Sequence, residues 1–448
     1  MPNPALPPGP RGKLLNVTLL PQIQRDFLAF GRKLQQQYGD TVYYRLAPLR
    51  IYQFTHPEQI YEVLVKKNAS FTKTFRFRDV LSRWNGNGLV VSEGEPWTRQ
   101  RRLVQPAFQP KRIAGYGELF VRHTRELFEP CSGREVNIAE ILHRLTFLNV
   151  AEALFGEDVS AIADEFLQIV AVLQKEAIAD FTAAWVTPMW WPTPSRARLR
   201  KAVRYLDKFV RGMIAKRRAS GEDRGDLLSM LLLAVDEEGG TGPMNDEQVR
   251  DEAVGLLLGG NETTATALTW TAYLLTANEA VQEAAQHEID SVTRGAAPSS
   301  KHVPLLILTA ATMKESMRLY PPAYVLSRQA AEEVEIGGYM LPRGAQVHLP
   351  VYTVQRDERW FDRASEFVPQ RFFDDGEKHF ARGAYFPFGT GPRVCIGRGF
   401  ALFEGTLIMA TILQQFHLRR SETTEPEHEA QISLHPQGGL KVTLEPRA

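Results

Sequence analysis

The chain has 448 residues, of which 44% are hydrophobic, so it can bury the core of one large domain or of two or three ordinary ones. It carries 53 Lys and Arg against 52 Asp and Glu, and the resulting formal net charge of +1 excludes a global field that draws proteins onto nucleic acid or anionic lipid. Cysteine occurs only at Cys131 and Cys395, which excludes a disulfide framework and zinc sites built on paired cysteines, and fits a reducing cytoplasm.

The N-terminus is rich in proline, and we expect residues 1–12 to form a short extended arm. No long apolar run follows, which predicts neither a signal peptide nor a membrane span. Apolar residues then recur at intervals of three and four, which predicts helices over 118–128, 138–155, 162–175 and 197–216. Strand-like stretches are few and short: 41–54, 334–336, 346–350, and a C-terminal pair, 432–434 with 440–444, across a Gly-Gly turn. The predicted fold is mainly α with a small β region, and no stretch resembles an interdomain linker.

A long helix is predicted over 246–275, but Gly259 and Gly260 interrupt it just before Glu262 and Thr263. Each glycine weakens a helix by about 1 kcal/mol relative to alanine. Either the helix is simply weak here, with polar residues on its surface, or another group must approach or open the backbone.

Glu315 and Arg318 follow on an apolar-periodic helix that two prolines end, so their charges share one helical face. Trp97 and Arg101 are likewise four residues apart in a basic segment. Such pairs are common on solvated helix faces, and neither pair indicates a function by itself.

Cys395 lies just before a predicted helix over 401–416, where free N–H groups and the helix dipole favour the thiolate that ligates iron. Gly389, Gly391 and Gly397 allow the backbone to turn tightly and to approach a flat ligand closely. Two alternatives are an inert core thiol and a nucleophilic cysteine, although no histidine stands beside it in the sequence.

The pattern Phe388-x-x-Gly391-x-Arg393-x-Cys395-x-Gly397 resembles the cysteine-ligand motif of the cytochrome P450 family. The other motifs stand in family order from Trp97 onwards, so the resemblance covers most of the chain. It implies a cytochrome P450 fold, with a single haem-binding domain over 1–448, and haem b between the 246–275 helix and the Cys395 loop.

The resemblance also implies roles for individual residues. Glu262 and Thr263 would steer water and protons on the distal side of haem. Glu315, Arg318 and Arg371 would form a buried network that holds the Cys395 loop. The sequence departs from the family pattern beside Arg371, where Gln370 replaces the commoner Glu. The haem contacts would be Cys395 on the iron, Phe388 beside the sulfur, Gly259 on the distal face, and Trp97, Arg101, Arg328 and Arg393 near the propionates.

The implied activity is a monooxygenase that inserts one atom of dioxygen into a C–H bond or double bond of an apolar substrate. Some segments are similar to those of soluble bacterial carotenoid and fatty-acid hydroxylases, which suggests a long-chain lipid, carotenoid or terpenoid. The alternatives are a peroxide-driven peroxygenase of the same fold and a non-catalytic haem-binding protein. Residues expected to face the substrate are Phe75, Trp84, Leu256, Val325, Leu326 and Gln437.

The chain has no G-x-G-x-x-G segment that opens a helix after a strand, so it carries no dinucleotide site of that kind. Electrons must therefore come from a partner, and we expect a ferredoxin or flavodoxin with its reductase. A local basic patch of Arg102, Arg382 and Arg398 is the predicted docking surface. No nucleic acid partner and no membrane span are expected, and the expected location is the cytoplasm.

Overall fold

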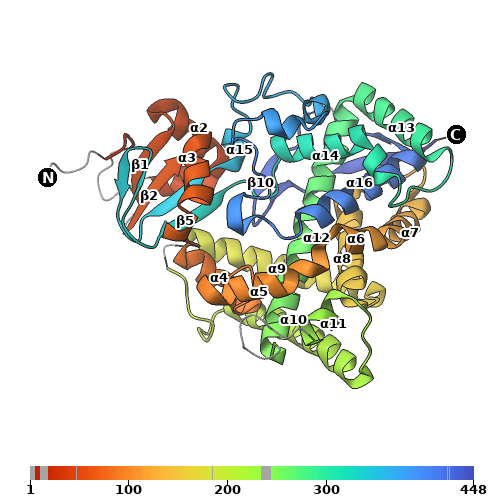
Figure 1. Cartoon of the computed structure of the whole chain (residues 1–448), viewed down its shortest axis with the longest axis horizontal. Coiled ribbons are helices and arrows are strands. Elements are labelled where there is room, and N and C mark those ends of the chain that lie inside the picture. Colours follow the sequence, from red (N-terminus) through yellow and green to blue (C-terminus); the bar gives the residue numbers. More distant parts are fainter. Residues whose placement is uncertain are drawn as a thin grey trace. The chain divides into compact units, whose positions relative to one another are not determined.

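The computed structural model describes residues 6–10, 19–46, 48–183, 185–233, 244–420, 422 and 424–447. It forms two compact units, each made of two segments of the chain: Met1–Phe77 with Lys314–Cys395, and Arg78–Met313 with Ile396–Ala448. Figure 1 labels many of these helices and strands and colours the chain in sequence order. Most of the predicted arm over 1–12 lies outside the described residues.

The first unit is built around a five-stranded sheet in the order β1-β2-β8-β5-β3. Its first two strands, β1 (Thr41–Leu46) and β2 (Leu49–Phe54), are an antiparallel hairpin within the predicted 41–54 stretch. The next strand, β8 (Gln346–Leu349), comes from the second segment and runs parallel to β2. Apolar side chains including Phe54, Ile60 and Val347 pack into a core against this sheet.

The remaining elements of the first unit are mostly short. They are α1 (Leu20–Arg25), α2 (Phe27–Tyr38), α3 (Pro57–Tyr61), the π-helix η2 (Glu62–Lys66), β3 (Phe71–Thr72), β5 (Leu326–Ala330), β6 (Val334–Ile336), β7 (Tyr339–Leu341), α15 (Val351–Val354), and the 3-10 helices η3 (Asn68–Ser70), η8 (Pro369–Phe372), η9 (Gly376–His379) and η10 (Gly391–Arg393).

The second unit is mainly helical. Its helices are α5 (Gly94–Val104), α6 (Pro110–Gly115), α7 (Gly117–Phe128), α8 (Ile138–Phe155), α9 (Ala163–Thr182), α10 (Pro194–Ser220), α11 (Leu227–Leu233), α12 (Asp246–Ala277), α13 (Glu279–Thr293) and α16 (Arg398–Gln415), with short 3-10 turns between some of them. Two further helices, α4 (Phe75–Asn85) and α14 (Ile307–Leu319), contain unit boundaries. Small sheets complete the unit: β4 (Glu135–Asn137) with β12 (Lys441–Pro446) and β9 (Phe416–Arg419), and β10 (His428–Ala430) with β11 (Leu434–Pro436).

The helices confirm the periodicity argument. The predicted 138–155 helix is α8 to the residue, while α9 and α10 extend beyond their predicted ends. Thr193 caps α10 by accepting a hydrogen bond from the Arg196 N–H, and Pro194 stands in its first turn, which extends this helix upstream of the predicted start. The prediction of a mainly α fold with a small β region is confirmed.

The long helix α12 is continuous from Asp246 to Ala277, so the predicted interruption at the two glycines is wrong. A capping box between Asn245 and Gln248 begins the helix. Along most of its length α12 is buried, and it packs on α8. Tertiary packing therefore supplies the stability that the glycines remove.

The predicted C-terminal strand pair is also wrong. The strand β11 pairs with β10, whereas β12 pairs with β4 and β9. Between β11 and β12, Gly438 and Gly439 both have positive φ, and the Asn137 side-chain oxygen accepts a hydrogen bond from the Leu440 N–H. Because Asn137 ends β4, this contact directs the chain into the β4 sheet.

Among the helices of the described residues, none has the length and hydropathy needed to cross a membrane.

Candidate active site

The loop that carries Cys395 belongs to the first unit. The Cys395 N–H donates to the Phe388 carbonyl oxygen at 2.9 Å, which closes the loop, and the Cys395 side chain is exposed. Gly389 and Gly391 both have positive φ, as a tight turn of this kind requires. The backbone thus presents the thiol at the end of a rigid turn, and α16 begins three residues later at Arg398.

Gly391 is needed for a second reason. A Cβ atom at this position would lie 2.3 Å from the Leu64 carbonyl oxygen of η2, so no other residue fits without moving the backbone. On its other side the loop lies near β5, because a Cβ at Gly389 would be 3.6 Å from Leu326 Cδ1. The Cys395 loop therefore rests directly on η2 and β5.

Glu315, Arg318 and Arg371 come together in the first unit. The Arg318 Nε and Nη2 atoms donate to the two Glu315 carboxylate oxygens at 2.7 and 2.8 Å, and the Arg371 Nε donates to Glu315 Oε1 at 3.0 Å. Glu315 and Arg318 are both fully buried. Burial lowers the pKa of Arg318, and the Glu315 carboxylate opposes this by stabilising the charge.

Gln355 connects this network to the Cys395 loop, and the sequence analysis did not identify it. Its backbone oxygen accepts from Arg318 Nη1 at 2.7 Å, and its side-chain oxygen accepts from the Phe386 N–H at 2.9 Å. The Tyr385 hydroxyl also donates to the Lys314 carbonyl oxygen on α14. Phe386 and Tyr385 begin the segment that leads to Cys395, so α14 and the loop are held together at two points.

The other predicted cofactor contacts of the first unit are Phe388, Arg328 and Arg393, and all three are partly exposed. Arg328 lies on β5, where its Nη1 atom donates to the Ser327 carbonyl oxygen at 2.9 Å. In the second unit, Trp97 and Arg101 are half-buried neighbours on α5, with the guanidinium carbon 5.8 Å from the indole centroid.

Gly259 and Thr263 lie one turn apart on helix α12 and are both exposed, although most of this helix is buried. The Thr263 hydroxyl donates to the Gly259 carbonyl oxygen at 2.8 Å. A Cβ at Gly259 would meet nothing within 4 Å, whereas one at Gly260 would lie 2.8 Å from Val150 Cγ2 of α8. Close helix packing thus explains Gly260, and an open face of the helix explains Gly259.

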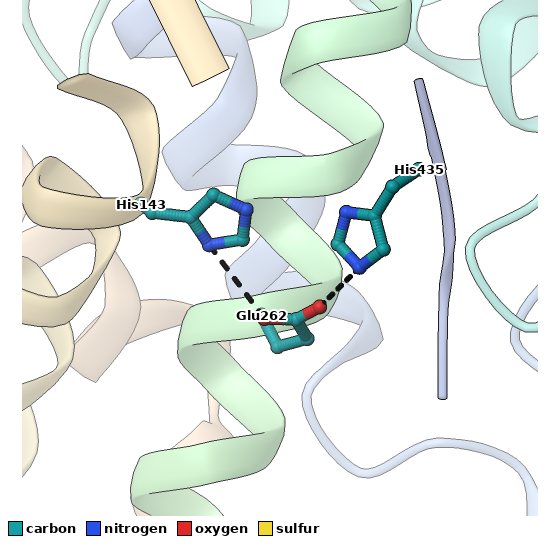
Figure 2. A group of neighbouring side chains, drawn as sticks. All are labelled: His143, Glu262 and His435. Atoms are coloured by element: carbon teal, nitrogen blue, oxygen red, sulfur yellow. Dashed lines mark ion pairs between the residues drawn. The ribbon is translucent and has the colours of Figure 1, made fainter. Parts of the chain in front are cut away.

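Glu262 is buried, in contrast to its exposed neighbour Thr263. Its Oε1 atom lies 2.5 Å from His435 Nε2 and accepts from the Ser433 hydroxyl at 2.8 Å, while its Oε2 atom is 3.6 Å from His143 Nδ1. Figure 2 shows the two imidazoles facing the carboxylate from opposite sides. Burial alone would raise the pKa of Glu262, but the hydrogen bonds and the imidazoles outweigh it and lower the pKa to about 2.

The sequence analysis missed both histidines. His143 lies on the predicted 138–155 helix and His435 beside the C-terminal turn, so nothing in the local pattern of either distinguishes it from a structural histidine. Only the packing of α8, α12 and β11 brings them to Glu262.

The residues predicted to face the substrate are placed in different environments. Phe75 and Gln437 are exposed, and Val325 and Leu326 are half-buried. Trp84 and Leu256 are buried. Phe75, Val325 and Leu326 belong to the first unit, and Trp84, Leu256 and Gln437 belong to the second.

The sequence matches known proteins along most of its length. The model of a family described as Cytochrome P450 matches residues 7–443. Cyclooctatin synthase of Streptomyces melanosporofaciens is 36% identical over 417 residues, covering 92% of this chain and 89% of that protein. Cyclooctat-9-en-7-ol 5-monooxygenase of the same organism is 36% identical over 386 residues, covering 85% and 83%. Pentalenene oxygenase of Streptomyces avermitilis is 32% identical over 412 residues, covering 91% and 89%.

Proposed function

Because the chain belongs to the cytochrome P450 family, it is a haem-thiolate monooxygenase that inserts one atom of dioxygen into an apolar substrate, and we propose which residues carry this activity. Cys395 supplies the thiolate. The observation that carries this assignment is the exposed thiol on a glycine turn that Gly391 seats against the Leu64 carbonyl. The donor set suits haem b, since a soft thiolate binds iron and nearby arginines can pair with carboxylates.

The chain offers a matched control for this assignment, since Cys131 is its only other cysteine. The reduced protein with carbon monoxide should show the red-shifted Soret band of thiolate ligation. Cys395→Ser should abolish this band, and Cys131→Ser should retain it. A folded Cys395→Ser protein that keeps the band would refute the assignment.

When bound, haem supplies the oxygen chemistry, because electron density from the thiolate favours O–O cleavage. The protein's contribution on the distal side is proton supply from Thr263 and Glu262. The Thr263 hydroxyl hydrogen is held by the Gly259 carbonyl oxygen, so the hydroxyl oxygen can accept a hydrogen bond from water and hold that water on the exposed side of α12. Glu262 is ionised, and it can accept and pass on protons from the groups around it.

Thr263→Ala should uncouple the enzyme, with less product formed per dioxygen consumed and more hydrogen peroxide released. The matched control is Thr269→Ala, because Thr269 makes the same hydrogen bond to the preceding turn of α12, at 2.8 Å to the Ala265 oxygen, but is buried. Equal coupling in the two variants would argue against the role of Thr263. The peroxygenase alternative predicts product with peroxide alone, and the non-catalytic alternative predicts no product from either oxidant.

Trp97, Arg101, Arg328 and Arg393 are proposed to hold the haem propionates. The expected result of Arg393→Gln is a lower haem content per chain, with the Cys395 ligation band unchanged in position. Full haem content in this variant would remove Arg393 from the set.

The electron donor is proposed to be a ferredoxin or flavodoxin that docks on basic side chains. Arg102, Arg382 and Arg398 are each exposed, as a docking residue must be. Charge reversal at any of them should slow reduction by the partner without changing reduction by dithionite. Unaltered partner rates in all three variants would exclude this surface.

A terpenoid is the proposed substrate class among the three considered. The support is the names of the relatives: pentalenene is an alkene by its suffix, cyclooctat-9-en-7-ol is an unsaturated alcohol, and neither name denotes a carboxylic acid. A spectral titration of the ferric protein with terpenoids, carotenoids and fatty acids should show the iron spin shift at the lowest concentration for a terpenoid. A response to a fatty acid at lower concentration would argue against a terpenoid substrate.

The proposed location is the cytoplasm, since a chain with only two cysteines fits a reducing compartment. A single haem-binding domain over 1–448 is likewise a proposal.

A further inference from the structure

Three side chains from three elements of the second unit converge on one point. They are His143 on α8, Glu262 on α12 and His435 on β11. One ligand atom from each lies within 4.8 Å of the other two. Figure 2 shows that both imidazoles point toward the carboxylate, one from each side.

The contact between His143 and Glu262 is not a hydrogen bond. The separation of 3.6 Å between Nδ1 and Oε2 is too long for one. Within the described part of the chain, the ring nitrogens of His143 make no hydrogen bond to any group. Two ligands of one tetrahedral metal ion lie roughly 3.3 Å apart, because each metal bond is about 2.0 to 2.2 Å long. The distance between the His143 imidazole and the Glu262 carboxylate is therefore close to that between two ligands of the same ion.

Two hydroxyl groups, of Ser433 and Thr266, contact the side chains of the cluster. The Ser433 hydroxyl donates to Glu262 Oε1 at 2.8 Å. The Thr266 hydroxyl lies 3.3 Å from His435 Nδ1, the ring nitrogen that does not face the carboxylate. Such contacts fix the orientation of a ligating imidazole and carboxylate.

We propose that His143, Glu262 and His435 form a binding site for a divalent transition-metal ion, of which zinc is the best match. Two imidazole nitrogens and one carboxylate oxygen suit zinc and disfavour magnesium and calcium, which take oxygen ligands. Water completes four-coordination.

The site has a consequence that rests on the proposed function. A metal ion held by Glu262 would remove this carboxylate from proton supply beside Thr263. Bound zinc should therefore slow oxygenation and lower the product formed per dioxygen, while leaving haem and its thiolate in place.

The test measures zinc directly. The haem-loaded protein, purified without a histidine tag and freed of metal by a chelator, is titrated with zinc chloride in a calorimeter, and its zinc and iron contents are measured after gel filtration. We expect one zinc per chain. Loss of a supporting residue at metal sites commonly weakens binding by about 10- to 100-fold, so His143→Gln and His435→Gln, which remove ligands, should each weaken it at least that much. His287→Gln on α13 is the control, because His287 is exposed and distant in sequence from the cluster.

Absence of stoichiometric zinc at micromolar concentrations would overturn the proposal. Zinc binding that survives both ligand substitutions, in variants whose carbon monoxide band shows correct folding, would also overturn it. Zinc X-ray absorption should report two imidazoles in the wild type and one in each variant. If zinc binds at this site and turnover is unchanged, the metal site stands and the proposed proton role of Glu262 fails.

Discussion

Arg318 has no exposed surface, yet each nitrogen of its guanidinium group donates a hydrogen bond. Besides Glu315, it donates to the carbonyl oxygens of Gln355, Ala364 and Glu366 at 2.7 to 2.9 Å. A buried charge is tolerated only when it is paired and fully hydrogen-bonded. The sequence shows only a helical Glu and Arg three residues apart, and the resemblance, not the spacing, indicated that they are buried.

Glu315→Gln should strongly destabilise the protein, because it keeps the shape of the side chain but leaves Arg318 buried without a counter-charge. Breaking such a pair typically costs about 3 to 5 kcal/mol. The exposed pair of Glu366 with Arg363 at 3.3 Å provides the control, and Glu366→Gln should change stability by less than about 1 kcal/mol. Urea unfolding midpoints and haem content per chain measure both effects. Equal midpoints would show that the buried pair contributes no net stability.

Glu404 of α16 is a buried acid with one hydrogen bond, from Asn149 Nδ2 to its Oε1 atom at 2.8 Å. Burial raises its pKa to about 8, from a usual value of 4.5. Between these values the folded protein keeps a proton that the unfolded chain releases. This contribution to stability is therefore complete below pH 4.5, decreases as pH rises, and is lost above about pH 8.

Glu404→Gln should remove this pH dependence, because glutamine resembles the protonated acid. Relative to wild type, the variant should gain stability from pH 5 to pH 8, by at most about 1.4 kcal/mol per pH unit. Urea midpoints of both proteins at several pH values give the difference, in which the other titrating groups cancel. Parallel curves would mean that Glu404 titrates normally.

At the scale of the element, the two adjacent glycines of α12 differ in their surroundings: Gly260 packs closely on Val150, whereas the space beside Gly259 is open. Gly260→Ala should destabilise the fold, because overpacking against Val150 costs about 1 to 3 kcal/mol and outweighs the gain in helix propensity of about 1 kcal/mol. Gly259→Ala meets no such contact and should not destabilise it. The double variant Gly260→Ala with Val150→Ala should recover part of the loss from Gly260→Ala. Absence of any coupling between the two sites in unfolding experiments would contradict this packing account.

Helices were easier to predict than strands for a physical reason. The spacing of apolar residues that predicts a helix lies within the helix itself, so α7 and α8 could be placed almost to the residue. Strand partners are set by distant segments. The sequence suggested that residues 440–444 pair with the preceding strand, whereas Asn137 directs them to β4. Gln355 escaped prediction likewise, because its role depends on groups from three separate segments.

At the scale of the whole molecule, the near-zero net charge limits electrostatic docking to local surfaces. The rate of reduction by a ferredoxin or flavodoxin should therefore fall as ionic strength rises from 0.05 to about 0.5 M, over which screening shortens to a few ångströms. Reduction by dithionite serves as the control, since it needs no docking. A partner rate that does not depend on salt would exclude basic side chains as the docking surface.

The family and fold class could be predicted from the sequence, whereas the division into two units could not. Each unit combines segments that are far apart in the chain, as the hydrogen bond between Gln35 and Asp357, 322 positions apart, illustrates. The family resemblance proposes Cys395 and Thr263 as site residues without this information. It cannot reveal the cluster of His143 and His435, since no rule of spacing joins them to Glu262.

The hairpin of β10 and β11 is tied to α12 beyond its contacts with Glu262, since the Trp270 indole N–H donates to the Leu434 carbonyl oxygen at 2.6 Å. The β10–β11 hairpin therefore helps to set the surroundings of Glu262. The surroundings of Glu262 can thus be altered by substituting Ser433 and His435, while every residue of α12 is left unchanged.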